Sequence, residues 1–121
     1  MTAWELVHLF WLMALAHFVA DYVFQNDVMA VQKGPRTNDH PAVPWPYWMA
    51  AHCATHALAV SLITGSVLLG VLELIVHFGQ DLAKCLGKLA LLQDQLLHLA
   101  WKAVWVLIAC AWAWGLRTAV P

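Results

Sequence analysis

Long apolar stretches fill most of the chain, and charged residues rarely interrupt them. About 20 consecutive apolar residues can cross the hydrocarbon core of a bilayer as a helix, and four stretches approach or reach that length. The pattern predicts helices at about residues 4–30, 47–69, 71–86 and 92–115. We therefore predict an all-α fold, and because the charged faces of a soluble bundle are missing, we expect it to lie in a membrane. It would be a polytopic membrane four-helix bundle of two antiparallel hairpins, forming a single domain over residues 1–121.

The connections between these helices differ in polarity. Residues 32–46 form a polar loop rich in proline, which cannot continue a helix. The second and third helices meet at residues 65–70 without a charge, and the third and fourth meet near Gly87, a plausible helix stop. Basic residues in the first and third connections are Lys33, Arg36, Lys84 and Lys88. The positive-inside tendency places these loops in the cytoplasm and both termini outside, in a multi-pass protein of the bacterial inner membrane.

Composition narrows the class of protein. The 121 residues are 63% hydrophobic and 11% charged, with a formal net charge of −1. Such a chain lacks the basic face that nucleic acid requires, so we expect membrane lipid as a partner, no nucleic acid, and leave homo-oligomerisation open. The first apolar stretch lacks a basic start and is too long for a secretory signal, so it is interpreted as a mature helix. The three cysteines have no metal-binding spacing and are interpreted as small packing residues.

Four pairs of polar residues recur within the apolar stretches, each pair spaced by four residues. This spacing is about one helical turn, so both members of a pair project from the same helix face. The pairs are His17/Asp21, His52/His56, His77/Asp81 and Asp94/His98. In antiparallel hairpins all four pairs fall at the same depth, toward the basic loops. Polar groups inside apolar helices are costly and usually mark function.

The register of the second hairpin sets particular residues opposite one another. A hairpin folded about Gly87 places His77 opposite His98. Glu73 lies one turn before His77, and Lys102 lies one turn after His98. We therefore predict a buried ion pair between Glu73 and Lys102, because lone charges inside a membrane are rarely tolerated.

The first hairpin has a softer register because its loop is long. It places His17 near His56 and Asp21 near His52. His8 lies nine residues before His17 and should face the opposite side of the helix, so we assign it no ligand role.

The four pairs have the chemistry of a metal site. Carboxylate and histidine side chains on facing helices commonly build metal sites in bundles. Mixed nitrogen and oxygen ligands favour zinc first, then manganese or iron, over calcium. A structural zinc uses four ligands, so the surplus indicates two ions, or one ion with hydrogen-bonded partners. The predicted metal ligands are His17, Asp21, His52, His56, His77, Asp81, Asp94 and His98. The alternative is that these residues form interhelical hydrogen bonds that hold the helices together.

The order of the motifs extends this interpretation. After His17 the chain carries Asp21-x-x-x-Gln25-x-Asp27-x-Met29-Ala30, His52-x-x-x-His56, His77-x-x-x-Asp81-x-x-Lys84 and Asp94-Gln95-x-x-His98. This set resembles a family of small bacterial and phage membrane proteins known only as a domain of unknown function. The resemblance covers most of the chain, apart from residues 34–48, and implies a four-helix membrane fold without an activity. More loosely, the chain is similar to small membrane-bound metal-dependent hydrolases with His/Asp pairs on helices.

The ligand set and the looser similarity together favour a metal-dependent membrane hydrolase. Its substrate would be a lipid head-group ester or phosphoester at the cytoplasmic interface, attacked by metal-activated water. The expected catalytic residues are Asp21, Asp81 and Lys84, with one carboxylate as general base and Lys84 neutralising a phosphate or oxyanion. Lys84 has an ordinary alternative as a lysine whose ammonium reaches the interface. The other candidate functions are a non-enzymatic metal-binding module, for ion binding, transport or scaffolding, and a membrane di-iron redox protein.

Overall fold

The computed structural model describes residues 2–119, with side chains up to residue 113. All regular secondary structure in this part of the chain is helical, which confirms the all-α prediction. The elements are α1 (Ala3–Val19), the π-helical η1 (Ala20–Phe24), α2 (Asp27–Gln32), α3 (Trp45–Thr64), α4 (Val67–Cys85) and α5 (Leu91–Ala119).

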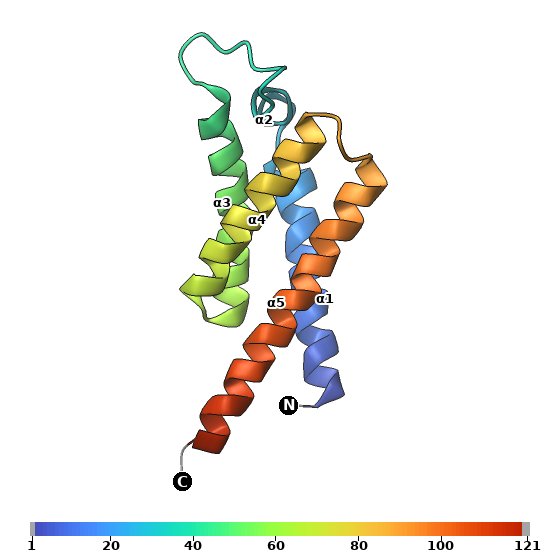
Figure 1. Ribbon diagram of the computed structural model, residues 1–121, viewed down its shortest axis with the longest axis vertical. Coiled ribbons are helices and arrows are strands. Elements are labelled where there is room, and N and C mark those ends of the chain that lie inside the picture. Colours follow the sequence, from blue (N-terminus) through green and yellow to red (C-terminus); the bar gives the residue numbers. More distant parts are fainter. Residues whose placement is uncertain (1, 120–121) are drawn as a thin grey trace.

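The long helices run up and down along one axis (Figure 1). Helix α2, the loop that follows it and the α4–α5 connection lie at one end of the molecule, and both chain termini lie toward the other. We call the first of these the loop end, formed by α2 and residues 33–44 and 86–90. The two basic connections therefore share one end, as the alternating direction of the helices requires.

The closest helix packing does not follow the predicted hairpins. Helix α3 packs most extensively against α4, and α1 packs most extensively against α5, from the other end of the sequence. Helix α1 also contacts α3, and α4 contacts α5. The α3–α4 pair is close because its connection is short, whereas the long loop after α2 lets α1 pair with α5.

Glycine ends two of the helices where the sequence predicts turns. Gly65 has φ 67° and Gly87 has φ 77°, both in the left-handed region that glycine adopts without strain. Ser66 then caps α4 by accepting a hydrogen bond from the backbone N of Leu69 at 3.3 Å. The predicted tight turn and the predicted stop at Gly87 are confirmed.

The predicted helix over residues 4–30 is divided in the structure. A π-helical turn, η1, follows α1, and Gln25 then takes an extended conformation with φ −82° and ψ 105°. The Asn26 side chain accepts a hydrogen bond from Met29 N at 2.8 Å and starts α2 as a new helix. The apolar pattern did not reveal this break because asparagine stops and restarts helices by local hydrogen bonds.

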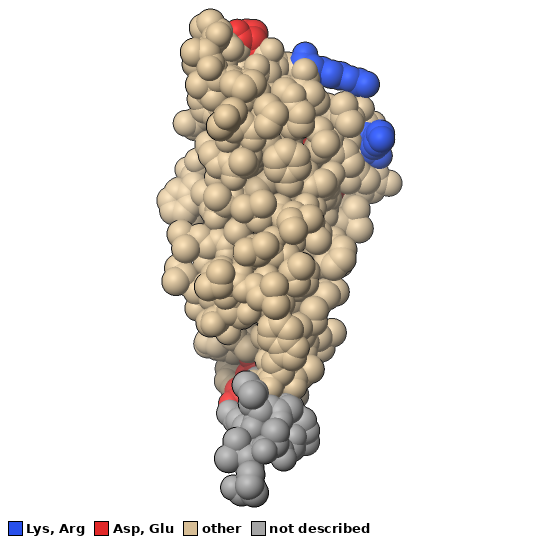
Figure 2. Space-filling view, turned by 60° about the vertical axis from the view of Figure 1, so that its left-hand side comes forward, with Lys and Arg blue, Asp and Glu red and all other residues tan. Residues whose placement is uncertain are grey.

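The distribution of side chains is inverted relative to a water-soluble protein. Asp94 and Lys102 are 0% and 2% exposed, whereas Trp4 and Leu62 are each 74% exposed. Figure 2 shows one face on which charged side chains gather near the two ends, with a broad uncharged band between them. Large exposed apolar areas mark surfaces that contact a membrane or another protein.

A small apolar core lies away from the loop end. Its fully buried members come from all four long helices: Met13, Val60, Leu69, Trp105 and Val106. Two helical stretches among the described residues are long and apolar enough to cross a membrane, Ala3–Phe24 and Leu91–Ala113. Helices α3 and α4 are not among these stretches.

We expect Gly70→Ala to loosen the contact between α3 and α4. A Cβ at Gly70 would lie 2.7 Å from the carbonyl oxygen of Ala57 and 3.1 Å from Cβ of Ser61, so the helices would have to separate. Overpacking of this kind lowers the free energy of unfolding by about 1–3 kcal/mol, which denaturation in detergent would measure. Gly79→Ala is the control, because a Cβ there meets nothing within 4 Å. Equal effects of the two substitutions would contradict the close packing.

Candidate metal centre

The eight predicted ligand side chains converge in one region between the four long helices. We call this set the polar cluster: His17, Asp21, His52, His56, His77, Asp81, Asp94 and His98. Seven of the eight residues are at most 2% exposed, and the side chain of Asp21 is 10% exposed. The sequence therefore predicted which residues come together, whereas their roles as ligands stay predictions.

The histidine register predicted for both hairpins is confirmed. The ring centroids of His77 and His98 lie 4.1 Å apart, and those of His17 and His56 lie 5.2 Å apart. His8, in contrast, is exposed on the surface. The spacing of four residues thus selected the helix faces correctly.

Asp21 lies in the π-helical turn η1. The turn is closed by a hydrogen bond from Gln25 N to Ala20 O at 3.1 Å. Single π-helical turns occur frequently at functional sites, because the extra residue changes the direction of the side chains that follow. The turn points Asp21 at α3 while His17, on the α-helical turn before it, also faces the cluster.

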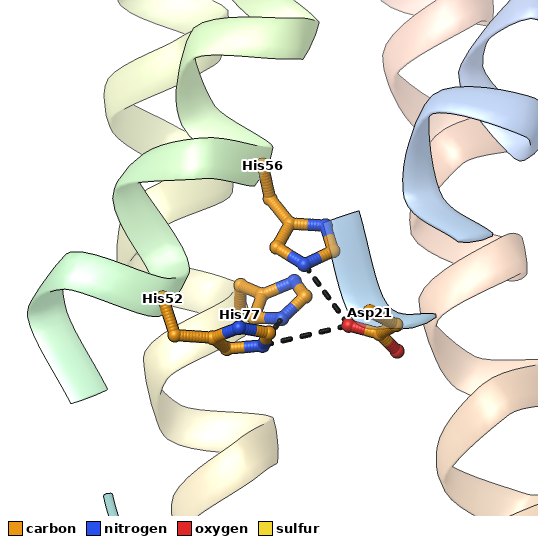
Figure 3. Close-up of side chains that lie close together, drawn as sticks. All are labelled: Asp21, His52, His56 and His77. Carbon is orange, nitrogen blue, oxygen red and sulfur yellow. Dashed lines mark hydrogen bonds and ion pairs between the residues drawn. The ribbon is translucent and has the colours of Figure 1, made fainter. Parts of the chain in front are cut away.

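Four side chains of the cluster form a first group that could hold an ion. Asp21, His52, His56 and His77 each offer one ligand atom, and these atoms all lie within 4.8 Å of one another. Figure 3 shows the three imidazoles and the carboxylate pointing toward one another from η1, α3 and α4. Asp21 Oδ1 lies 3.0 Å from His56 Nε2 and 3.5 Å from His52 Nε2.

Three of these separations, 3.0, 3.3 and 3.5 Å, are close to the edge of a coordination tetrahedron. Ligands about 2.0–2.1 Å from a zinc ion lie roughly 3.3 Å from one another. His52 Nε2 and His77 Nε2 are 3.3 Å apart. His56 Nε2 is close to Asp21 but makes no hydrogen bond of acceptable geometry to any described residue. Close approach without hydrogen-bond alignment is expected of two ligands that face a shared ion.

A second group consists of His77, Asp81 and His98. Asp81 Oδ1 lies 3.1 Å from His98 Nε2 and 3.7 Å from His77 Nε2. Asp81 Oδ2 lies 3.2 Å from His52 Nε2, so the two groups adjoin. Since His77 belongs to both groups through the same nitrogen, it can serve one ion at a time.

His17 and Asp94 belong to neither group: His17 lies beside Asp21 and His98, and Asp94 lies beside His98. His17 Nε2 lies 3.1 Å from Gln95 Oε1. Asp94 Oδ1 lies 3.3 Å from His98 Nε2 without a hydrogen bond in the described structure. These two residues can support ligands or exchange protons without coordinating an ion.

The predicted ion pair between Glu73 and Lys102 is confirmed. Lys102 Nζ donates to Glu73 Oε1, and the indole Nε1 of Trp105 donates to Glu73 Oε2 at 2.5 Å. Glu73 Oε1 also lies 3.1 Å from Nδ1 of His77. A carboxylate on the outer nitrogen of a histidine fixes the ring so that Nε2 faces the metal. The pair therefore orients a shared member of both groups.

Residues that were not predicted as part of the cluster also contact it. Lys33 Nζ lies 2.5 Å from Asp81 Oδ2, and Gln95 Nε2 donates to Asp21 Oδ2 at 3.0 Å. Gln80 Nε2 donates to the carbonyl of Asp94 at 2.7 Å. The sequence marked Gln95 through its motif with His98, whereas Lys33 was interpreted only as a loop charge.

Comparison with known proteins assigns the chain to a family. The model for the family "Protein of unknown function (DUF3307)" matches residues 9–119, so the chain belongs to this family. The matched range includes the whole polar cluster. Neither the curated proteins nor the solved structures contain a match to this chain. Function must therefore be inferred from the site.

We expect Lys102→Met to be strongly destabilising, because it leaves the carboxylate of Glu73 buried without its ammonium partner. Breaking a buried ion pair typically costs about 3–5 kcal/mol, whereas replacing both partners costs much less. The double variant Glu73→Gln/Lys102→Met should therefore recover most of the lost stability. Unfolding in detergent measures both, with the exposed Lys88→Met as control. Additive losses in the double variant would contradict the pairing.

Proposed function

We propose that this member of the family is a multi-pass membrane protein in which α1 with η1, α3, α4 and α5 form a transmembrane four-helix bundle. The exposed apolar band and the buried charges support this placement. Of the four basic residues in the connections, Lys33 and Lys84 contact carboxylates of the cluster. The proposed orientation in the membrane therefore depends on the other two, Arg36 and Lys88, which are exposed. By the positive-inside tendency, we propose that the loop end lies in the cytoplasm of a bacterial cell and the termini outside.

We propose further that the polar cluster binds one or two divalent ions, zinc first and manganese or iron as alternatives. The observation that carries this proposal is the convergence of imidazole nitrogens and carboxylate oxygens at 3.0–3.7 Å from four separate helical segments. The first group offers three histidines and one aspartate, a donor set that suits tetrahedral zinc. A second ion would use Asp81 and His98 and compete for His77.

The chemistry that such a centre supports best is metal-dependent hydrolysis. A bound ion lowers the pKa of a coordinated water and polarises a phosphoryl or carbonyl oxygen. With Asp21 and Asp81 as ligands, Asp94 remains as a carboxylate outside both groups, with Oδ1 available to take a proton. Lys84 Nζ lies 2.8 Å from Asp94 Oδ2 and supplies positive charge for an oxyanion. We infer a substrate with a lipid head-group ester or phosphoester, reached from the loop end.

Burial of the ligands favours one alternative, a non-enzymatic metal-binding module. Seven of the eight cluster residues are at most 2% exposed, which suits an ion that holds helices together. Transport across the membrane has less support, because the Glu73–Lys102 pair and the apolar core lie between the cluster and the other end.

We expect the purified protein to contain one or two equivalents of zinc, measured by elemental analysis after extraction without chelators. His56→Ala and Asp81→Ala each remove a ligand atom from a metal-sized group and should lower the metal content. His8→Ala, on the exposed side of α1, should leave it unchanged. A wild-type protein without metal above background would refute the metal centre. Iron with a visible absorption band would favour the redox protein.

We expect hydrolysis of phospholipid head groups that stops with a chelator and returns when zinc is added. Asp94→Asn should lower turnover by about a hundredfold or more, the usual contribution of a general base, while metal content stays at the wild-type level. Head-group release from mixed micelles, followed by phosphorus NMR, measures the reaction. Full metal occupancy without turnover of any phospholipid class would favour the non-enzymatic module.

A further inference from the structure

A pocket opens at the loop end beside the polar cluster. Its volume is about 300 Å³. The residues that line it come from the segment after η1, α2, the following loop and α4: Gln25, Ala30, Lys33, Thr37, Lys84 and Cys85. We propose that this pocket binds a phosphoryl group, with Lys33 and Lys84 as its cationic contacts. This inference deepens the proposed function and rests on its metal centre.

The two lysines stand between the pocket and the cluster. Lys33 Nζ contacts Asp81 Oδ2 at 2.5 Å, and Lys84 Nζ contacts Asp94 Oδ2 at 2.8 Å. An ammonium group has three N–H donors, so each lysine retains donors for a ligand in the pocket. The side chain of Lys84 is 32% exposed and that of Lys33 is 7% exposed. A phosphoryl group between them would lie next to Asp81, a member of the second group, and Asp94, which lies beside that group.

Gln25 adds an acceptor to the same pocket. Its Oε1 is buried and has no hydrogen-bond partner among the described residues, while its Nε2 donates to the carbonyl of Asp21 at 3.4 Å. A hydroxyl or amine beside the phosphoryl group could satisfy this oxygen. Some phosphate monoesters and some phospholipid head groups, such as phosphoethanolamine, carry such neighbours.

The charge of the region couples the pocket to the metal centre. The carboxylates in and beside the cluster outnumber the ammonium groups there by one. The carboxylates are Asp21, Glu73, Asp81 and Asp94, and the ammonium groups are Lys33, Lys84 and Lys102. With neutral histidines the region carries a net charge of −1, which opposes an anion. One divalent ion changes this to +1. Metal and phosphoryl group should therefore strengthen each other's binding, as reciprocal linkage requires.

The test is a calorimetric titration of the full chain with inorganic phosphate, in a detergent that contains no phosphorus. We expect binding at least tenfold tighter with zinc bound than after chelation. Lys33→Gln and Lys84→Gln should each weaken phosphate binding by about ten- to a hundredfold, the worth of a charge-assisted hydrogen bond. Lys33→Arg keeps the charge and should retain binding. Lys88→Gln, an exposed lysine of the loop end outside the pocket, is the matched control.

The outcomes separate the pocket from the metal centre. Zinc binding without phosphate binding, or phosphate binding unaffected by either lysine variant, would overturn the pocket and leave the metal centre in place. Absence of zinc binding would overturn both. Competition by short-chain phosphatidic acid identifies a lipid as the source of the phosphoryl group, and failure to compete identifies a soluble phosphate ester; both support the phosphoryl site.

Discussion

The structure depends on mutual satisfaction of polar side chains inside an apolar exterior. Where no water reaches a charged group, its partners must come from neighbouring helices, and an unpaired charge is strongly destabilising. Asp21 contacts nitrogens from α1, α3 and α5. Asp81 contacts nitrogens from the loop end, α3, α4 and α5. Each carboxylate thus contacts several segments, and these contacts help to fix the positions of the helices relative to one another.

This arrangement divides the molecule along its length. The half near the loop end is held by polar contacts, and the half near the termini is held by apolar packing around Met13, Val60 and Leu69. Trp105 belongs to both halves, because its ring packs in the apolar core and its Nε1 donates to Glu73. Polar and apolar contacts therefore stabilise adjoining regions, and substitutions in the apolar half do not touch the polar cluster directly.

The sequence predicted what local periodicity determines. A spacing of four residues fixes a helix face whatever surrounds it, so the eight cluster residues and the Glu73–Lys102 pair followed from their positions. The pairing of α1 with α5 and the approach of Lys33 did not follow, because both depend on how a long loop closes. The π-helical turn was also missed, since one additional residue per turn leaves no trace in an apolar stretch.

The π-helical turn η1 connects the polar cluster directly to α2 and Lys33 at the loop end. Asp21 lies in η1, and Lys33, twelve residues later, lies against Asp81 from above the cluster. The extra residue in the π-helical turn changes the direction of the chain, so that α2 lies at the loop end. A lid on a separate hinge could open without disturbing its active site. Here the segment that carries Lys33 continues directly from the turn that carries Asp21, so the cover of the loop end and one wall of the polar cluster belong to a single stretch of chain.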